Sequence, residues 1–316
     1  MNRFIIIFAL IFLIITAFPG LAIEIGGSFR FENLAFRWDR EINDGFSATD
    51  FCYGGIFYFR HKFQKFEQNL SLHAEYSYDA ILKNTVRSIV YYNGNFFSFG
   101  VGPFIGFMNT EQVLPKFGIT SQFRIQVPGI IFTDMGMDST VGNQLEEDGN
   151  YQQEKSFISV GFYVPNAICS FNIIRRIFTE LDDSVEIVDK QVDYSFSADI
   201  FKKNVPYKVL LTFGFQSLSK TYDSDIEHKL YSIIIGAQVN VDISDTITLT
   251  FGLDSSIYTF GQEELLGVSN PGTYLFRATA GINVNLDRII SERKLRGDEE
   301  EIIEEIEEET QLEDEE

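Results

Sequence analysis

Apolar and polar residues alternate with a period of two along most of residues 23–286. The pattern is clearest over 231–243, where Tyr, Ile, Ala and Val fill every second position and mostly polar residues fill the others. It repeats over 247–257, and only Ser244 and Asp245 separate the two segments. One face of each segment suits hydrocarbon and the other suits water. The pattern therefore predicts two antiparallel β-strands joined in a tight hairpin.

Two kinds of connection alternate between such segments. Short turns fall near 67–68, 92–95, 127–129, 164–166, 202–206 and 244–245, and polar, mostly longer breaks span 38–49, 79–85, 108–116, 135–154, 179–184, 221–228 and 260–272. This alternation predicts an all-β fold, an antiparallel transmembrane β-barrel of about 14 strands with both ends on the short-turn side. If the short strand after Gly129 does not form, the count falls to 12.

A soluble β-sandwich would show the same alternation, so it is the main alternative. A sandwich buries its apolar faces between two sheets, and its other faces meet water. The apolar faces here are rich in aromatic residues and the polar rows contain charges of both signs, which could not form a buried core. The sequence favours the barrel.

The first 22 residues have a different pattern. Arg3 precedes an apolar run over residues 4–18 in which Thr16 is the one polar residue, and residues 19–22 end the run with Pro, Gly, Leu and Ala. This order predicts a cleaved signal peptide over residues 1–22. The alternative, an uncleaved anchor helix, is disfavoured because the run is shorter than the roughly 20 residues that cross a bilayer.

Charge is distributed unevenly. The chain has a formal net charge of −21, and residues 291–316 contain 14 acidic and 3 basic residues. We therefore predict a barrel over residues 23–290 and a periplasmic acidic tail over 291–316 that is disordered or a short helix. The negative charge argues against nucleic acid as a partner. The predicted external breaks are also acidic, and such a pore mouth would concentrate cations.

Few residues suggest catalysis. His73 shares a strand face with a serine and a glutamate, but this spacing merely aligns the three side chains, and no residues have metal-ligand spacing. Gly100, Gly102 and Gly106 open no helix, so they are not a phosphate loop; we expect them to make room for large neighbours or an inward loop. The sequence predicts a protein that is not an enzyme and needs no cofactor or metal.

The charged residues on the polar faces are predicted to line the lumen. The predicted lumen-lining residues are Arg30, Arg60, Lys62, His73, Glu75, Arg124, Asp193, Asp199, Lys208, Asp242, Asp254 and Arg277. Opposed charges in a water-filled pore orient polar solutes, which favours a passive pore for small hydrophilic solutes. The same charges can instead pair and plug the interior. The alternative is a closed barrel acting as an adhesin, receptor or structural protein, and an inward or outward course of residues 135–154 would separate the two.

The last strand segment, residues 274–286, resembles the closing strand of bacterial outer-membrane β-barrel proteins. The family's assembly signal has a polar residue, a glycine two positions on, and hydrophobic residues at alternate positions. Thr279, Gly281, Val284 and Leu286 occupy these places. The resemblance implies a cell outer membrane location, with outer-membrane lipid and the insertion machinery as partners. The chain is also similar in size to monomeric porins of about fourteen strands, which implies a monomer.

Cys52 and Cys169 are the two cysteines. The predicted strand directions put Cys52 at the outer end of its strand and Cys169 just beyond a short periplasmic turn. A disulfide needs Cα atoms within about 7 Å. We therefore predict two separate thiols.

Overall fold

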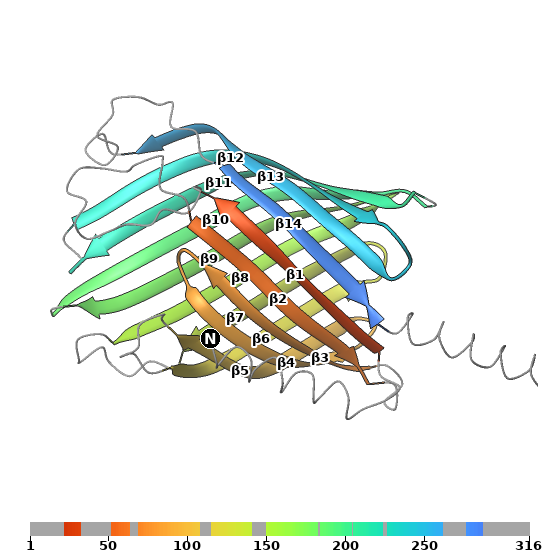
Figure 1. Cartoon of the computed structure of the whole chain (residues 1–316), viewed down its shortest axis with the longest axis horizontal. Helices are drawn as coiled ribbons and strands as arrows, with labels where there is room; N and C mark the ends of the chain where they lie inside the picture. The colour runs from red at the N-terminus through yellow and green to blue at the C-terminus, as the bar shows by residue number, and fades with distance from the viewer. Residues whose placement is uncertain are drawn as a thin grey trace, which may run out of the picture.

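The computed structural model describes residues 22–32, 52–63, 69–107, 115–140, 150–182, 184–203, 205–223, 226–261 and 276–286. These segments contain fourteen strands: β1 (Ala22–Glu32), β2 (Cys52–Lys62), β3 (Leu70–Asp79), β4 (Lys83–Asn93), β5 (Phe97–Phe107), β6 (Lys116–Val127), β7 (Ile131–Thr140), β8 (Tyr151–Val164), β9 (Ala167–Asp182), β10 (Val185–Phe201), β11 (Tyr207–Tyr222), β12 (Ile226–Asp242), β13 (Ile247–Gly261) and β14 (Phe276–Asn285). Each strand pairs antiparallel with the next, and β14 pairs with β1 (Figure 1). The predicted 14-stranded barrel is confirmed. The 12-strand alternative is wrong, because β7 is a strand of ten residues.

Several predicted regions lie outside the described residues, namely the signal peptide except Ala22, the break at 38–49 and the acidic tail. No helix in the described part of the chain is long and apolar enough to cross a membrane. Cys52 begins β2 and Cys169 lies near the start of β9, and Cys169 is a free thiol.

The barrel is apolar outside and polar inside. Large hydrophobic side chains such as Phe213, Ile235 and Phe251 are each more than half exposed on the outer surface. A register slip of one residue would exchange the two faces of a strand, so this pattern fixes the register. Exposed apolar area on this scale is typical of a surface that meets lipid. The fold is therefore that of a transmembrane β-barrel.

Several predicted breaks are wrong in extent. The break at 79–85 is a turn of three residues, and the breaks at 179–184 and 221–228 are mostly strand. The outer parts of the break at 135–154 are also strand, since β7 runs to Thr140 and β8 begins at Tyr151. Apolar alternation ends where lipid contact ends. The backbone ladder continues beyond that point, because unpaired strand edges are unfavourable.

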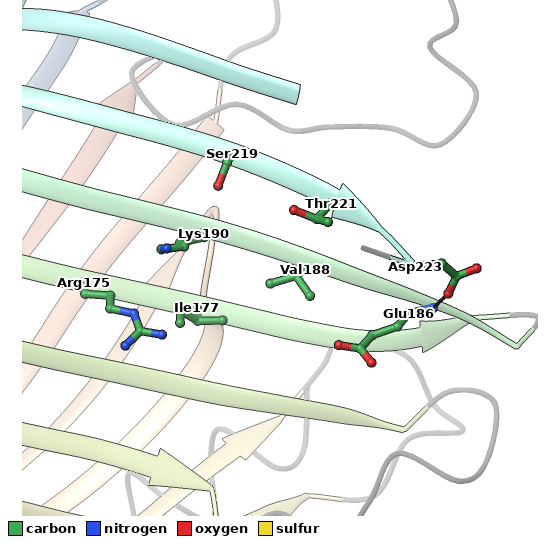
Figure 2. A pocket seen from close by; sticks show the side chains of 8 residues that line it. All are labelled: Arg175, Ile177, Glu186, Val188, Lys190, Ser219, Thr221 and Asp223. Carbon is green, nitrogen blue, oxygen red and sulfur yellow. Dashed lines mark hydrogen bonds between the residues drawn. The ribbon is translucent and has the colours of Figure 1, made fainter. Parts of the chain in front are cut away.

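The strands differ in length. β9 to β12 contain 16 or 17 residues each, whereas β1 to β7 contain 10 to 12. One wall is therefore taller, and its extra height lies at the end opposite the start of β1 and the end of β14 (Figure 1). Near these strand ends the outer face carries polar side chains, including Lys190 and Thr221 (Figure 2).

Candidate functional site in the barrel lumen

The ladder registers place all the predicted lumen residues on the face opposite the exposed apolar belt. They do not form one cluster. Lys62, Lys208 and Asp242 lie near the short-turn end of their strands. Arg60 forms an ion pair of 3.4 Å with Glu24, and both side chains are partly exposed. Whether these residues line a conducting pore stays a prediction.

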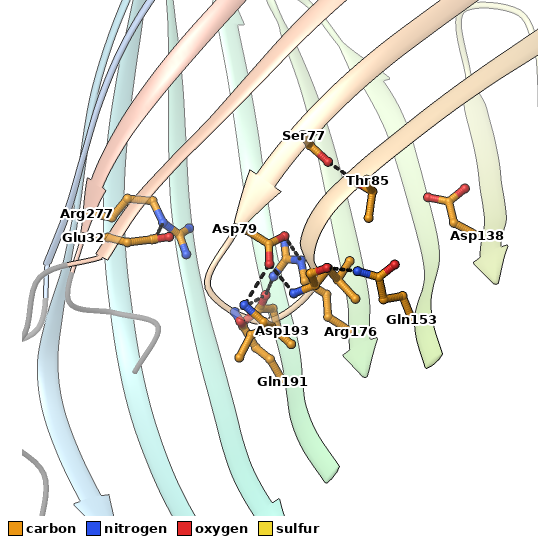
Figure 3. Close-up of polar contacts among 12 residues, drawn as sticks. Glu32, Ser77, Asp79, Thr85, Asp138, Gln153, Arg176, Gln191, Asp193 and Arg277 are labelled. Atoms are coloured by element: carbon orange, nitrogen blue, oxygen red, sulfur yellow. Dashed lines mark hydrogen bonds and ion pairs between the residues drawn. The ribbon is translucent and has the colours of Figure 1, made fainter. Parts of the chain in front are cut away.

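The turn between β3 and β4 folds into the lumen. Ile81 and Leu82 are almost completely buried, with 2% and 4% of their surface exposed. The Leu82 carbonyl accepts a hydrogen bond from the Gln153 side chain on β8. The Lys83 ammonium lies 5.5 Å from the centre of the Phe178 ring on β9. β8 and β9 stand on the far side of the barrel from β3, so the turn bridges the interior (Figure 3).

The sequence of this turn explains its shape. The Asp79 carboxylate accepts hydrogen bonds from the backbone N–H groups of Ile81 and Leu82, at 2.9 and 2.6 Å. An aspartate that bonds to the backbone two or three residues ahead stabilises a tight turn. Lys83 follows with a positive φ of 59°, which reverses the chain into β4. The apolar pair at the tip then packs inside the barrel.

A polar network holds the turn against the opposite wall. The Arg176 guanidinium on β9 lies 2.9 Å from Asp193 and 4.0 Å from Asp79. Gln191 and Gln216 also donate hydrogen bonds to the Asp193 carboxylate. Figure 3 shows Asp79 and Arg176 meeting in the lumen. These contacts link β3 to strands that lie far away around the barrel.

A second network fills the lumen beside β3, β4, β6 and β7. Arg87 lies 2.8 Å from Glu75 and 3.3 Å from Asp138, and all three side chains are at least 88% buried by surface area. Thr120 donates a further hydrogen bond of 2.5 Å to Asp138. Each buried charge thus has an opposite charge beside it, which offsets part of its desolvation cost.

Large uncharged side chains complete this filling. Ile89 and Phe104 point inward with 0% and 2% of their surface exposed. A Cβ at Gly100 would strike the Tyr91 ring, and one at Gly106 would strike the Gln153 amide. The structure therefore agrees with the expectation that these glycines make room for large neighbours.

The part of the lumen wall away from the turn, formed by the short-turn halves of β10 to β12 together with β13, β14 and β1, has smaller residues. Its inward positions include Ser195, Ser197, Gly214, Thr250, Gly252 and Gly281. We call this the small-residue side. Its charged groups include Arg277, which pairs with Glu32 and lies 3.6 Å from Asp254. Arg30 is next to this group, and it forms no hydrogen bond or ion pair with a residue that the structure describes.

Several lumen charges, including Arg87, Asp138 and Arg176, were not predicted from the sequence. Arg87 shares its face with Ile89 and Tyr91, and Arg176 shares its face with Ile174 and Phe178. Where both faces of a strand are apolar, alternation does not show which face is turned to the lumen. Asp138 was assigned to a loop. The available signal for an inward Arg87 was an opposite charge directly across the ladder, because Glu75 is paired with Arg87 in the register.

The closed barrel, the outward apolar belt and the polar lumen together define the class of this protein as a transmembrane β-barrel. No known protein family matches the sequence, and no curated protein is similar to it at a significant level. Solved structures do show similarity. In-vitro folded OmpT, an outer membrane protein of Vibrio cholerae, is 8% identical with a TM-score of 0.42, and the match covers 84% of this chain and 96% of that one.

Two further structures show the same coverage of this chain, 84%. An anion-selective porin from Comamonas acidovorans is 11% identical with a TM-score of 0.39, over 98% of its own length. The translocator domain of the autotransporter NalP from Neisseria meningitidis is 10% identical with a TM-score of 0.36, over 88% of its length.

Proposed function

We propose that this chain is an outer-membrane barrel that acts as a passive pore for small hydrophilic solutes. The observation that carries the proposal is the asymmetry of the lumen. The inward turn Asp79–Lys83 and the Arg87 network occupy one side, whereas small and polar residues line the other. Solutes would pass along the small-residue side, and the process involves no chemical step.

Two features support placement in an outer membrane. A closed barrel leaves no unpaired strand edge in lipid, and closure is the only way in which strands can span a bilayer. The start of β1 and the end of β14 lie at the same end of the barrel, as in bacterial barrels whose two ends face the periplasm. In this orientation the β3–β4 turn enters the lumen from the external mouth.

Single-channel recording of the refolded full chain in a planar bilayer tests the pore. We expect stable open steps of small, uniform size, because the turn narrows the lumen. Liposome swelling with sugars of increasing size would give the size limit of the solute. A folded, inserted barrel that shows neither steps nor swelling would contradict the pore.

The inward turn offers a specific test. Ile81→Ser together with Leu82→Ser removes the apolar packing of the tip. We expect the conductance to rise or to fluctuate between two levels, because the turn is then less firmly held. The matched control is Ile130→Ser, which changes an exposed isoleucine in the β6–β7 turn outside the lumen. An unchanged conductance in the double variant would mean that the turn does not limit flow.

The closed barrel remains the second candidate, and one observation favours it. The contacts of Asp79, Leu82 and Lys83 with the opposite wall bridge the lumen. If these bridges exclude ions, the tall wall of β9 to β12 would be the functional surface. The same recordings distinguish the two, because only the pore gives open steps.

A further inference from the structure

The outer face of the tall wall contains a pocket of about 470 Å³ on β9, β10 and β11. Arg175 and Lys190 lie on its membrane side, with Ile177 and Val188 beside them (Figure 2). All four residues lie on the outward faces of their strands, the same faces as the lipid-facing Ile173 and Tyr194. The pocket is therefore outside the lumen, and the proposed pore does not use it.

The height of Lys190 on the wall matches a membrane interface. Ile200, at the opposite end of β10, is 42% exposed and belongs to the apolar belt. The outward positions between them are Val192, Tyr194, Phe196 and Ala198. Ten residues of a strand tilted by about 40° rise about 26 Å, which is close to the roughly 25 Å height of the apolar band in such barrels. Lys190 thus lies where lipid headgroups begin.

The two cations have no partner within the described chain. Neither Arg175 nor Lys190 forms a hydrogen bond or an ion pair with a described residue, and both side chains are exposed. In the β9–β10 ladder, Arg175 is opposite Val192 and Lys190 is opposite Ile177. Arg175 and Lys190 are therefore diagonal neighbours, whose Cβ atoms are typically about 7–8 Å apart. One phosphate between them would contact both.

Acidic groups lie farther out or on the next strand. Glu186 and Asp223 line the far end of the pocket, where the Glu186 backbone N–H donates a hydrogen bond of 2.8 Å to the Asp223 carboxylate. Glu154 on β8 also faces outward, opposite Ile177 in the ladder. The cations are thus nearer the belt, where a lipid phosphate lies, and the acids are mostly nearer the external solvent.

We propose that Arg175 and Lys190 bind the phosphate of an anionic lipid in the outer leaflet. Arg presents a planar fork that matches phosphate oxygens, and Lys adds a point charge. Ile177 and Val188 give an apolar floor, and the Thr221 hydroxyl group offers a further hydrogen bond. This inference depends on the proposed membrane placement of the barrel, but it does not depend on whether the lumen conducts.

Native mass spectrometry of the refolded full chain with added lipid tests the site. The probes are diphosphoryl lipid A, phosphatidylglycerol and zwitterionic phosphatidylcholine. We expect the parent to retain the two anionic lipids. The double variant Arg175→Gln, Lys190→Gln should bind them roughly thirtyfold more weakly, given the typical contribution of a basic residue near an anionic membrane surface. Inorganic phosphate in excess should not displace the lipid, because it lacks acyl chains; displacement would assign the site to free phosphate and overturn the lipid proposal.

Two controls separate the site from general electrostatics. Lys202→Gln with Lys203→Gln removes the same charge from the opposite end of the barrel and should leave lipid retention unchanged. Arg175→Lys with Lys190→Arg keeps the charge and should retain most binding. Circular dichroism confirms that each variant is folded. Equal loss in the Lys202 and Lys203 variant, or no loss in the Arg175 and Lys190 variant, would overturn the proposal, whereas loss of conductance with intact lipid binding would count only against the pore.

Discussion

Arg87 is the residue whose removal should cost most inside the barrel. It is the shared partner of Glu75 and Asp138, and all three side chains are buried. Arg87→Ala leaves the two buried carboxylates without their shared guanidinium and with only Lys155, opposite Asp138 in the ladder, nearby. We expect a loss of about 3–5 kcal/mol in the free energy of unfolding. Urea titration of the refolded protein in lipid vesicles measures this.

The matched control is Arg60→Ala. Arg60 pairs with Glu24, but half of its side chain is exposed, so we expect a loss below about 1 kcal/mol. Similar losses in the two variants would mean that the Arg87 network is hydrated in the membrane.

The assignment of one face of each strand to lipid can be tested at Ile235. This side chain is 52% exposed and lies near the middle of the outward row of β12. Ile235→Arg should cost about 2–4 kcal/mol, the typical penalty of a cation near the bilayer midplane. Gln238→Arg, on the inward face of the same strand, should be tolerated far better. Gel mobility during unfolding in bilayers gives the stability of both variants. Equal stability of the two would contradict the assigned faces.

At the scale of elements, alternation predicted the strand count and most turns because each strand separates lipid from water. The residues of β12 and β13 show this most clearly. The inward course of the β3–β4 turn was not predictable in the same way. Asp79 to Leu82 has the polar start and short length of an ordinary turn, and its direction depends on Gln153 and Phe178, which are distant in the sequence.

The inward residues of the site were predictable wherever the alternation along a strand shows which positions face the lumen. Arg30, Arg277 and Asp254 have polar inward neighbours, and the register places them on the inward face as expected. Their pairing was not predictable, because Glu32 and Arg277 are separated by almost the whole barrel sequence and meet only through closure. The length of β7 was missed because its inward positions, Asp134, Gly136 and Asp138, are residue types that are depleted in strands, although Met135 and Met137 alternate with them on the outward face.

The β6–β7 turn allows a test of backbone conformation alone. Gly129 has a φ of +74°, and a Cβ there would meet no atom within 4 Å. Gly129→Ala should therefore cost about 1–2 kcal/mol from the left-handed conformation without any clash. Gly252→Ala, where a Cβ would be 3.4 Å from Gln238, should be close to neutral by comparison. Thermal unfolding in detergent compares the two variants, and an equal effect would contradict the assigned turn conformation.

For the whole molecule, charge predicts weak ion selectivity. The net charge is −21, and the charged lumen residues that the structure describes mostly form ion pairs. Excess acid near the mouth acts over about 30 Å at 0.01 M salt but only about 3 Å at 1 M. We expect a weak preference for cations in dilute KCl that nearly disappears at 1 M, measured by reversal potentials. A clear preference for anions in dilute salt would show that Arg30 and its neighbours control permeation, and Arg30→Gln should then abolish it.

Closure of the sheet between β1 and β14 sets the order of assembly. Glu24 pairs with Asn285, so the joint connects the two ends of the barrel sequence. Contacts between such distant residues form late, because ordering the long intervening chain costs entropy. Until β14 arrives, β1 and β13 both present free edges that can pair with other chains. A nascent chain that stalls before residue 276 is therefore an aggregation hazard, and export must keep it protected until its last strand has crossed.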